Sequence, residues 1–164
     1  MNQSSLPVRV SIIMGSQSDW TTMQAATRVL DELDVGYETR VVSAHRTPER
    51  LYRFASSAHV QGIEVIIAGA GGSAHLAGMA AAMTHLPVIA VPVSSRHFNG
   101  MDSLMSMVQM PRGVAVACQA VGEAGAYNAG LMAAQMLALA DSGLSQRLQE
   151  WRARQTDSIP HEVE

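Results

Sequence analysis

A histidine and an arginine stand side by side in the segment Ser43-Ala44-His45-Arg46-Thr47-Pro48. A histidine can give and take a proton near neutral pH, so His45 is a candidate general acid–base. The guanidinium of Arg46 offers a planar set of N–H donors that suits a phosphate or a carboxylate. Taken alone, such a pair is more typical of a solvated surface loop, and it predicts a site only if other polar loops join it.

The segment GSQSDW, residues 15–20, is a second candidate for ligand binding. Backbone N–H groups at the start of a helix favour an anion, and the hydroxyls of Ser16 and Ser18 can donate to a phosphate. Asp19 can accept a hydrogen bond from a sugar hydroxyl. Either Ser18 or Asp19 can equally be the N-cap of the helix that follows, so capping and ligand binding both stay open here.

A glycine-rich loop, GAGGSAH at residues 69–75, is the third candidate. It fits the pattern G-x-G-x-x-A after a strand, but residues 89–93 lack the acidic residue that a dinucleotide site needs about twenty positions later. We therefore exclude NAD and FAD. The loop can still approach a flat, charged ligand closely, because glycine carries no side chain. His75 either lines the same pocket or caps the next helix.

The composition excludes several classes of protein. All eleven basic residues are arginine, so the chain lacks the lysine amine that Schiff-base enzymes, pyridoxal phosphate enzymes and P-loops require. A net charge of −3 argues against a general nucleic-acid binder. Cys118 is the single cysteine, and the six histidines show neither HExxH spacing nor an acidic cluster, so we expect no disulfide and no metal.

We expect a cytoplasmic protein without a membrane segment. Residues 1–7 are short and polar, unlike a secretory signal, and the apolar run 129–140 is too short to span a bilayer and contains Gln135.

Predicted strands and helices alternate regularly along the chain, and they must position these loops. This alternation predicts a parallel sheet covered on both faces, with ligands bound beyond the carboxyl ends of the strands. We predict a single domain over residues 1–164, with a short disordered N-terminal tail and a polar C-terminal tail. The predicted strands are 8–14, 37–42, 64–68, 88–91 and 114–117, and the predicted helices are 20–33, one beginning at 48, 79–83, 101–107, 123–140 and 144–154.

The helix predicted at 123–140 has almost no polar face, since alanine, leucine and methionine surround it. A helix that is apolar all round is buried on more than one side. In a chain of this length we expect another subunit to cover part of it, although alanine is also simply a good helix former.

Read together, the loops resemble the PurE family. The resemblance covers residues 8–157 and rests on the segments GSQSDW, VVSAHRTPE, IIAGAGGSAHLAGM, MDSLMSMVQMPRGV and RLQEWRARQTD. It implies a flavodoxin-like, three-layer α/β fold with a central parallel sheet, and a homo-octamer whose pockets are shared between subunits. Its bacterial form implies a mutase of purine biosynthesis that needs no ATP, metal or organic cofactor. That mutase moves a carboxyl group from the exocyclic nitrogen to ring carbon 4, converting 5-(carboxyamino)imidazole ribonucleotide to 4-carboxy-5-aminoimidazole ribonucleotide.

The same resemblance implies a role for each loop residue. His45 would be the general acid–base, and Asp19 would bind the ribose. The 5′-phosphate would be held by Ser16, Ser43 and Arg46, and the moving carboxylate would be surrounded by Gly71, Ser73, His75 and Leu76.

The chain also departs from the family pattern. Ala77 stands where proline is common, Ser73 where alanine is frequent, and Glu123 where lysine is often found; the segments 94–100 and 117–130 differ as well. Apart from these departures, three alternative functions are considered: a direct carboxylase acting on aminoimidazole ribonucleotide and carbon dioxide, a non-catalytic phosphosugar or nucleotide-binding module, and a purely structural oligomeric subunit.

Overall fold

Five parallel strands form one sheet in the order β2-β1-β3-β4-β5 in the computed structural model, which describes residues 6–163. This strand order is the flavodoxin-like one, so the predicted fold class is confirmed. The tail expected at the N-terminus lies outside the described residues. The strands are β1 (Val8–Met14), β2 (Gly36–Val41), β3 (Val65–Gly71), β4 (Val88–Val93) and β5 (Ala117–Cys118).

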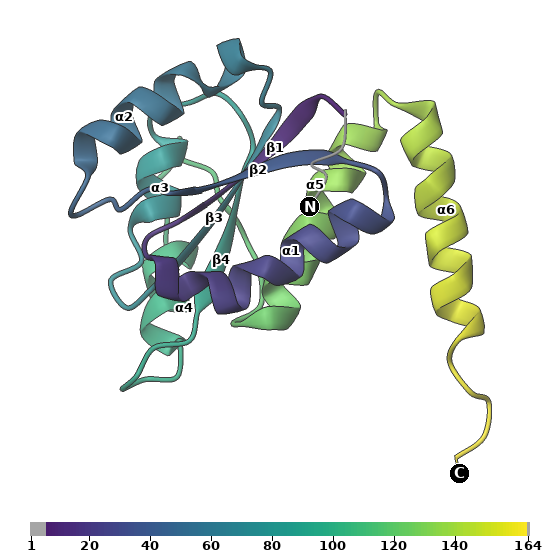
Figure 1. Cartoon of the computed structure of the whole chain (residues 1–164). Coiled ribbons are helices and arrows are strands. Elements are labelled where there is room, and N and C mark those ends of the chain that lie inside the picture. The colour runs from purple at the N-terminus through teal and green to yellow at the C-terminus, as the bar shows by residue number, and fades with distance from the viewer. Residues whose placement is uncertain (1–5, 164) are drawn as a thin grey trace.

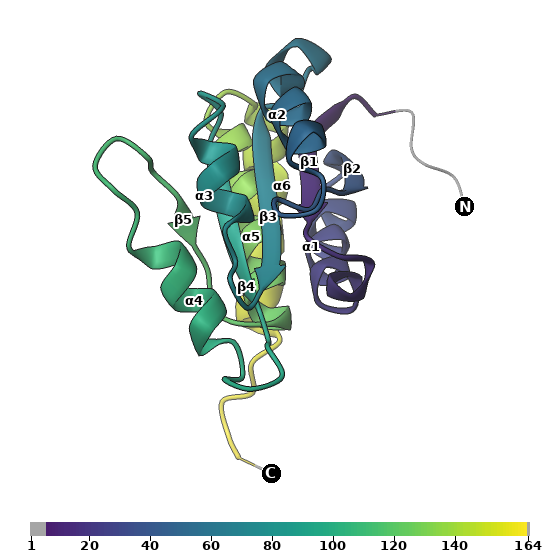
Figure 2. The same cartoon turned by 90° about the vertical axis from the view of Figure 1, so that its left-hand side faces the viewer.

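Helices cover both faces of the sheet, as Figures 1 and 2 show. On one face lie α1, α5 and α6, and on the other lie α2, α3 and α4, so that each face has its own hydrophobic core. The central strands are almost continuous runs of apolar residues because both of their faces are buried. The helices are α1 (Trp20–Glu32), α2 (Pro48–Ser57), α3 (Leu76–Ala81), α4 (Met101–Val108), α5 (Glu123–Ala138) and α6 (Ser142–Asp157).

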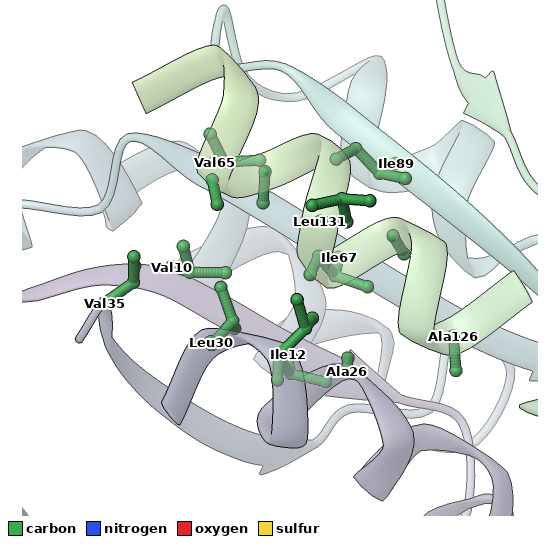
Figure 3. Close-up of a cluster of buried hydrophobic side chains, with 14 of the residues drawn as sticks. Val10, Ile12, Ala26, Leu30, Val35, Val65, Ile67, Ile89, Ala126 and Leu131 are labelled. Atoms are coloured by element: carbon green, nitrogen blue, oxygen red, sulfur yellow. The ribbon is translucent and has the colours of Figure 1, made fainter. Parts of the chain in front are cut away.

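The apolar helix α5 is covered mainly by its own chain. It packs against α1, β3, β4 and α6, and Figure 3 shows its Ala126 and Leu131 among side chains of α1 and the sheet. The approach to α1 is close because Gly130 has no side chain: a Cβ there would lie 2.5 Å from the backbone oxygen of Ala26. The small residues of α5 therefore serve packing within the chain, and a subunit contact is not needed to explain them.

Several predicted boundaries were wrong by a few residues. β5 begins at Ala117 rather than at 114, because Val114 N–H closes a turn onto Pro111 O. β3 and β4 both run further than predicted, since their pairing continues to Gly71 and Val93. Helix α3 begins at Leu76 rather than at 79.

The boundary between the last two helices also differs from the prediction. α5 ends at Ala138 rather than at 140, and α6 spans Ser142–Asp157 rather than 144–154. α6 begins early because the side chain of Asp141 caps it, with Oδ1 accepting a hydrogen bond from Leu144 N–H at 3.0 Å.

Across residues 6–163, no helix has both the length and the hydropathy needed to cross a bilayer. Within the same range, no three or more histidine, cysteine or acidic side chains come together as metal ligands would.

Candidate active site

A pocket of about 530 Å³ opens at the carboxyl edge of the sheet. It lies where the strand order reverses, with β2 on one side of β1 and β3 on the other, which is the place where open α/β sheets bind ligands. The loops after β1, β2, β3 and β4 all contribute to its wall. The pocket brings together all nine residues named from the sequence: Ser16, Asp19, Ser43, His45, Arg46, Gly71, Ser73, His75 and Leu76.

The two histidines of the pocket touch each other. His45 Nε2 lies 2.8 Å from His75 Nδ1, and the rings meet edge to face. In such a contact one nitrogen carries the hydrogen and the other accepts it, so the pair shares one proton across this bond. His75 occupies the N-cap position of α3 without a side-chain capping bond. Of the two alternatives for His75, the structure thus favours the one in which it lines the pocket.

Arg46 is held between two of the loops. Its Nε donates to Ser43 Oγ at 3.1 Å, and its Nη2 donates to Gly15 O at 2.8 Å. The loop itself is braced by Thr47, whose Oγ1 accepts from Ser43 N–H and donates to Ser43 O. Fixing the guanidinium in this way presents a positioned cation to an anion in the pocket.

Asp19 both caps a turn and lines the pocket. Its Oδ2 accepts a hydrogen bond from Ser16 N–H at 2.9 Å, while Ser16 Oγ accepts from Ser18 N–H, which together form a capping box around the 3-10 turn Gln17–Asp19. The capped element is thus this turn rather than α1. Burial raises the pKa of the Asp19 carboxyl above its ordinary value, and the Ser16 N–H and the Arg46 charge partly counteract it.

The glycine-rich loop is anchored from α4. Gly72 adopts a left-handed conformation, with φ of +69°, which glycine tolerates without strain. Ser103 Oγ accepts from Gly72 N–H at 2.9 Å and donates to Val93 O at 2.7 Å. Ser103 is fully buried. Through these two hydrogen bonds its hydroxyl links the ends of β3 and β4 to α4 beneath the pocket.

Sequence reasoning missed three of the residues that line the pocket. Ser94, Ser95 and Arg96 line the pocket, whereas in the sequence their segment stands out only as a departure from the family pattern. The signal was present, since these residues follow the fourth predicted strand and the carboxyl ends of parallel strands share one edge. The role of Ser103 carried no local signal, because its partners lie ten and thirty-one residues away.

Known proteins match this chain over nearly its full length. The family model described as AIR carboxylase matches residues 9–158. The N5-carboxyaminoimidazole ribonucleotide mutase of Escherichia coli (strain K12) is 55% identical over 159 residues, covering 97% of this chain and 94% of the relative. The enzymes of the same name from Brucella melitensis and Bacillus subtilis are both 58% identical, covering 94% and 92% of this chain and 95% and 93% of the relatives.

A solved structure agrees. The crystal structure of Treponema denticola PurE superposes with a TM-score of 0.82 at 26% identity, covering 92% of each chain. The resemblance inferred from the loop motifs is thereby confirmed. On the family model and on relatives more than half identical over nearly their full length, this chain belongs to the AIR carboxylase (PurE) family.

Proposed function

We propose that this protein is a mutase that converts 5-(carboxyamino)imidazole ribonucleotide to 4-carboxy-5-aminoimidazole ribonucleotide. The observation that carries the proposal is a histidine pair able to exchange a proton, His45 and His75, beside the fixed guanidinium of Arg46 in one pocket. Relatives that bear the name of this mutase are 55–58% identical over more than nine-tenths of the chain, which favours the mutase over the direct carboxylase.

In this proposal the phosphate and ribose hold the substrate at one end of the pocket. Arg46 pairs with the 5′-phosphate, and the hydroxyls of Ser16 and Ser43 donate to it. Asp19 keeps Oδ2 on Ser16 N–H and offers Oδ1 to a ribose hydroxyl. The imidazole ring then extends toward His45 and the glycine-rich loop.

The reaction needs one proton donor that later becomes a base. As the bond between the exocyclic nitrogen and the carboxyl carbon breaks, protonated His45 gives its proton to that nitrogen and carbon dioxide is released. Ring carbon 4 attacks this carbon dioxide to form the new carbon–carbon bond, and neutral His45 removes the proton from carbon 4. Atoms and charge balance, since the carboxylate and one proton have exchanged places.

The surrounding loops keep the intermediate in reach. The backbone from Gly71 to Leu76, with the side chains of Ser73 and His75, encloses the carboxylate and offers it hydrogen-bond donors. Holding carbon dioxide against the ring replaces a bimolecular encounter with an intramolecular one.

The test is turnover of 5-(carboxyamino)imidazole ribonucleotide by the purified chain in the absence of ATP, metal and bicarbonate. Formation of the 4-carboxy product is expected. Product formed only from aminoimidazole ribonucleotide and bicarbonate would instead identify the direct carboxylase. Ligand binding without turnover of either substrate would identify the binding module.

The proposal also includes a homo-octamer of single-domain chains in the cytoplasm. It is supported by an exposed apolar stripe on α4 and the loop before it, where Phe98, Met101, Met105 and Val108 are 43–67% exposed in the single chain. Met101, Met105 and Val108 follow helical spacing and share one side of α4, and a patch of this kind is typical of an interface.

A further inference from the structure

A second hollow, of about 680 Å³, lies between the end of β2 and α2. Four arginines line it: Arg40, Arg46, Arg50 and Arg53. These are four of the eleven basic residues of a chain whose net charge is −3, so positive charge is strongly concentrated at this one place. We call this hollow the arginine groove; β2 and α2 can be followed in Figure 1.

The fold positions these arginines in different ways. Arg50 and Arg53 are three residues apart and share one face of α2, and Arg50 Nη1 donates to Val41 O at 3.0 Å. Arg40 comes from β2, and its guanidinium lies over the ring of Phe54, 5.5 Å from the ring centre. Arg50 is therefore held against backbone and Arg40 against an aromatic ring, whereas the side chain of Arg53 is 76% exposed to solvent.

The charge of the groove is only partly compensated. Arg40 pairs with Glu38 at 2.6 Å, and Arg53 pairs with Glu49. Within residues 6–163, Arg46 and Arg50 have no carboxylate at ion-pair distance, which leaves four arginines against two glutamates. The excess is two positive charges when Arg46, which also lines the candidate active site, is counted, and one when only Arg40, Arg50 and Arg53 are counted. A bound anion would compensate this excess.

Arg46 stands in the wall between the two hollows, but its contacts face the candidate active site. Its Nε and Nη2 are bound to Ser43 Oγ and Gly15 O. Arg40, Arg50 and Arg53 line only the arginine groove, and nothing in the proposed mutase reaction uses them. The groove thus has its own set of cations.

We propose that the arginine groove is a second binding site, separate from the candidate active site, for a small molecule that carries a diphosphate. Guanidinium groups pair with phosphate oxygens through two parallel hydrogen bonds, and several of them can share a diphosphate. The volume exceeds that of the 530 Å³ candidate active pocket and leaves room for an organic group beside Val41 and Pro48. A nucleic acid is disfavoured by the net charge of −3, which provides no extended basic face.

The proposal is tested by titrating the full-length protein calorimetrically with ADP in metal-free buffer. The wild type is expected to bind ADP saturably, and adenosine, which lacks phosphate, is expected not to bind. Arg50→Ala/Arg53→Ala should weaken ADP binding at least about tenfold, because two charge-assisted contacts are lost. The double variant Arg112→Ala/Arg154→Ala removes the same charge from exposed positions elsewhere and should bind ADP as the wild type does.

Three results would overturn the proposal: no saturable binding by the wild type, undiminished binding by Arg50→Ala/Arg53→Ala, or an equal loss in both double variants. Undiminished binding would place ADP in the candidate active site, where Arg46 is retained. Arg50→Gln/Arg53→Gln, with longer polar side chains, should show the same loss if the alanine variant unfolds. ADP binding is measured without turnover. A negative mutase assay therefore does not decide whether ADP binds to the groove, and a negative ADP titration does not decide whether the protein is a mutase.

Discussion

The contact between His45 and His75 determines how the candidate acid–base can work. With 2.8 Å between Nε2 of one ring and Nδ1 of the other, the hydrogen that one nitrogen donates must be accepted by its partner. If both nitrogens carried hydrogens, the contact would become repulsive. In the proposed reaction His75 therefore positions the ring of His45 and influences which of its nitrogens holds the proton.

His45→Asn tests the central role of that side chain. We expect kcat to fall by about 10²–10⁴, because asparagine can form hydrogen bonds but cannot act as acid and base at neutral pH. Steady-state turnover measures the loss, and thermal unfolding should show that the variant is as stable as the wild type. Near-normal kcat would remove His45 from the mechanism.

Arg46→Ala tests the phosphate contact. We expect KM to rise roughly 10–100-fold, because a charge-assisted contact to the phosphate is lost. Arg46 also holds Ser43 and Gly15 together, so Arg46→Lys is the useful comparison, since it keeps the charge without the planar donor set. An unchanged KM in both variants would show that the phosphate binds elsewhere.

At the level of elements, the helices depend on close packing in one place and on capping in another. α5 meets α1 at Gly130, where no side chain fits, whereas α6 begins at a capping carboxylate with an arginine beside it. Each feature can be tested by a single substitution.

Gly130→Ala should destabilise the fold by about 1–3 kcal/mol, because the added Cβ would meet Ala26 O at 2.5 Å and force α5 away from α1. The matched control is Gly143→Ala in α6, where a Cβ finds its nearest atoms at an ordinary 3.6 Å. That control should be neutral or stabilising, since alanine favours helix. Urea unfolding measures both, and equal effects would contradict the packing argument.

Asp141 makes the stability of α6 depend on pH. The hydrogen bond from Leu144 N–H, followed by the contact with Arg9, lowers the pKa of this carboxyl. A carboxyl whose pKa is lower in the folded than in the unfolded chain stabilises the fold above its unfolded pKa, and this stabilisation is lost as pH falls through the folded value.

We therefore expect Asp141→Asn to be less stable than the wild type at pH 7, with the difference shrinking as the pH falls below about 4. Asparagine keeps an oxygen that can accept from Leu144 N–H, so the comparison isolates the charge. Unfolding curves measured across this range check the prediction, and a constant difference would contradict it.

At the level of the whole molecule, strand order decides where chemistry can occur. The reversal at β1 separates the helices that follow β1 and β3 onto opposite faces and leaves an opening between their first turns. Four loops meet there, while the apolar stripe of α4 lies exposed beside the loop that carries Ser94, Ser95 and Arg96. An interface on that stripe would lie next to the candidate active site.

The proposed octamer predicts a mass of about 140 kDa by light scattering, eight times the 17.5 kDa of one chain. Met101→Glu/Met105→Glu should reduce this mass, because burying two carboxylates in an apolar contact is costly. Leu139→Glu is the control, since Leu139 is 90% exposed and lies outside the stripe. A monomeric wild type would refute the octamer.

Much of the architecture could be predicted from local pattern. Runs of β-branched residues mark strands buried on both faces, and polar or glycine-rich segments after them mark the carboxyl edge, so the parallel sheet and three candidate loops could be predicted from local pattern. The set of nine residues that line the pocket follows instead from the resemblance to the PurE family. The helix boundaries near residues 138–142 were less predictable, because the capping by Asp141 depends on geometry that periodicity does not encode.

The order of the elements, the chemistry available in each loop and the family can all be inferred from the amino-acid sequence. Which side chains meet is visible only in the folded chain, as in the contact of His45 with His75, the support of Gly72 by Ser103, and the gathering of Arg40 with Arg50 and Arg53. The coverage of α5 mainly by its own chain is likewise visible only in the fold. The physical reason is that burial patterns repeat over a few residues and can be read locally. Contacts between distant segments instead depend on strand order, register and the angles of helices on the sheet.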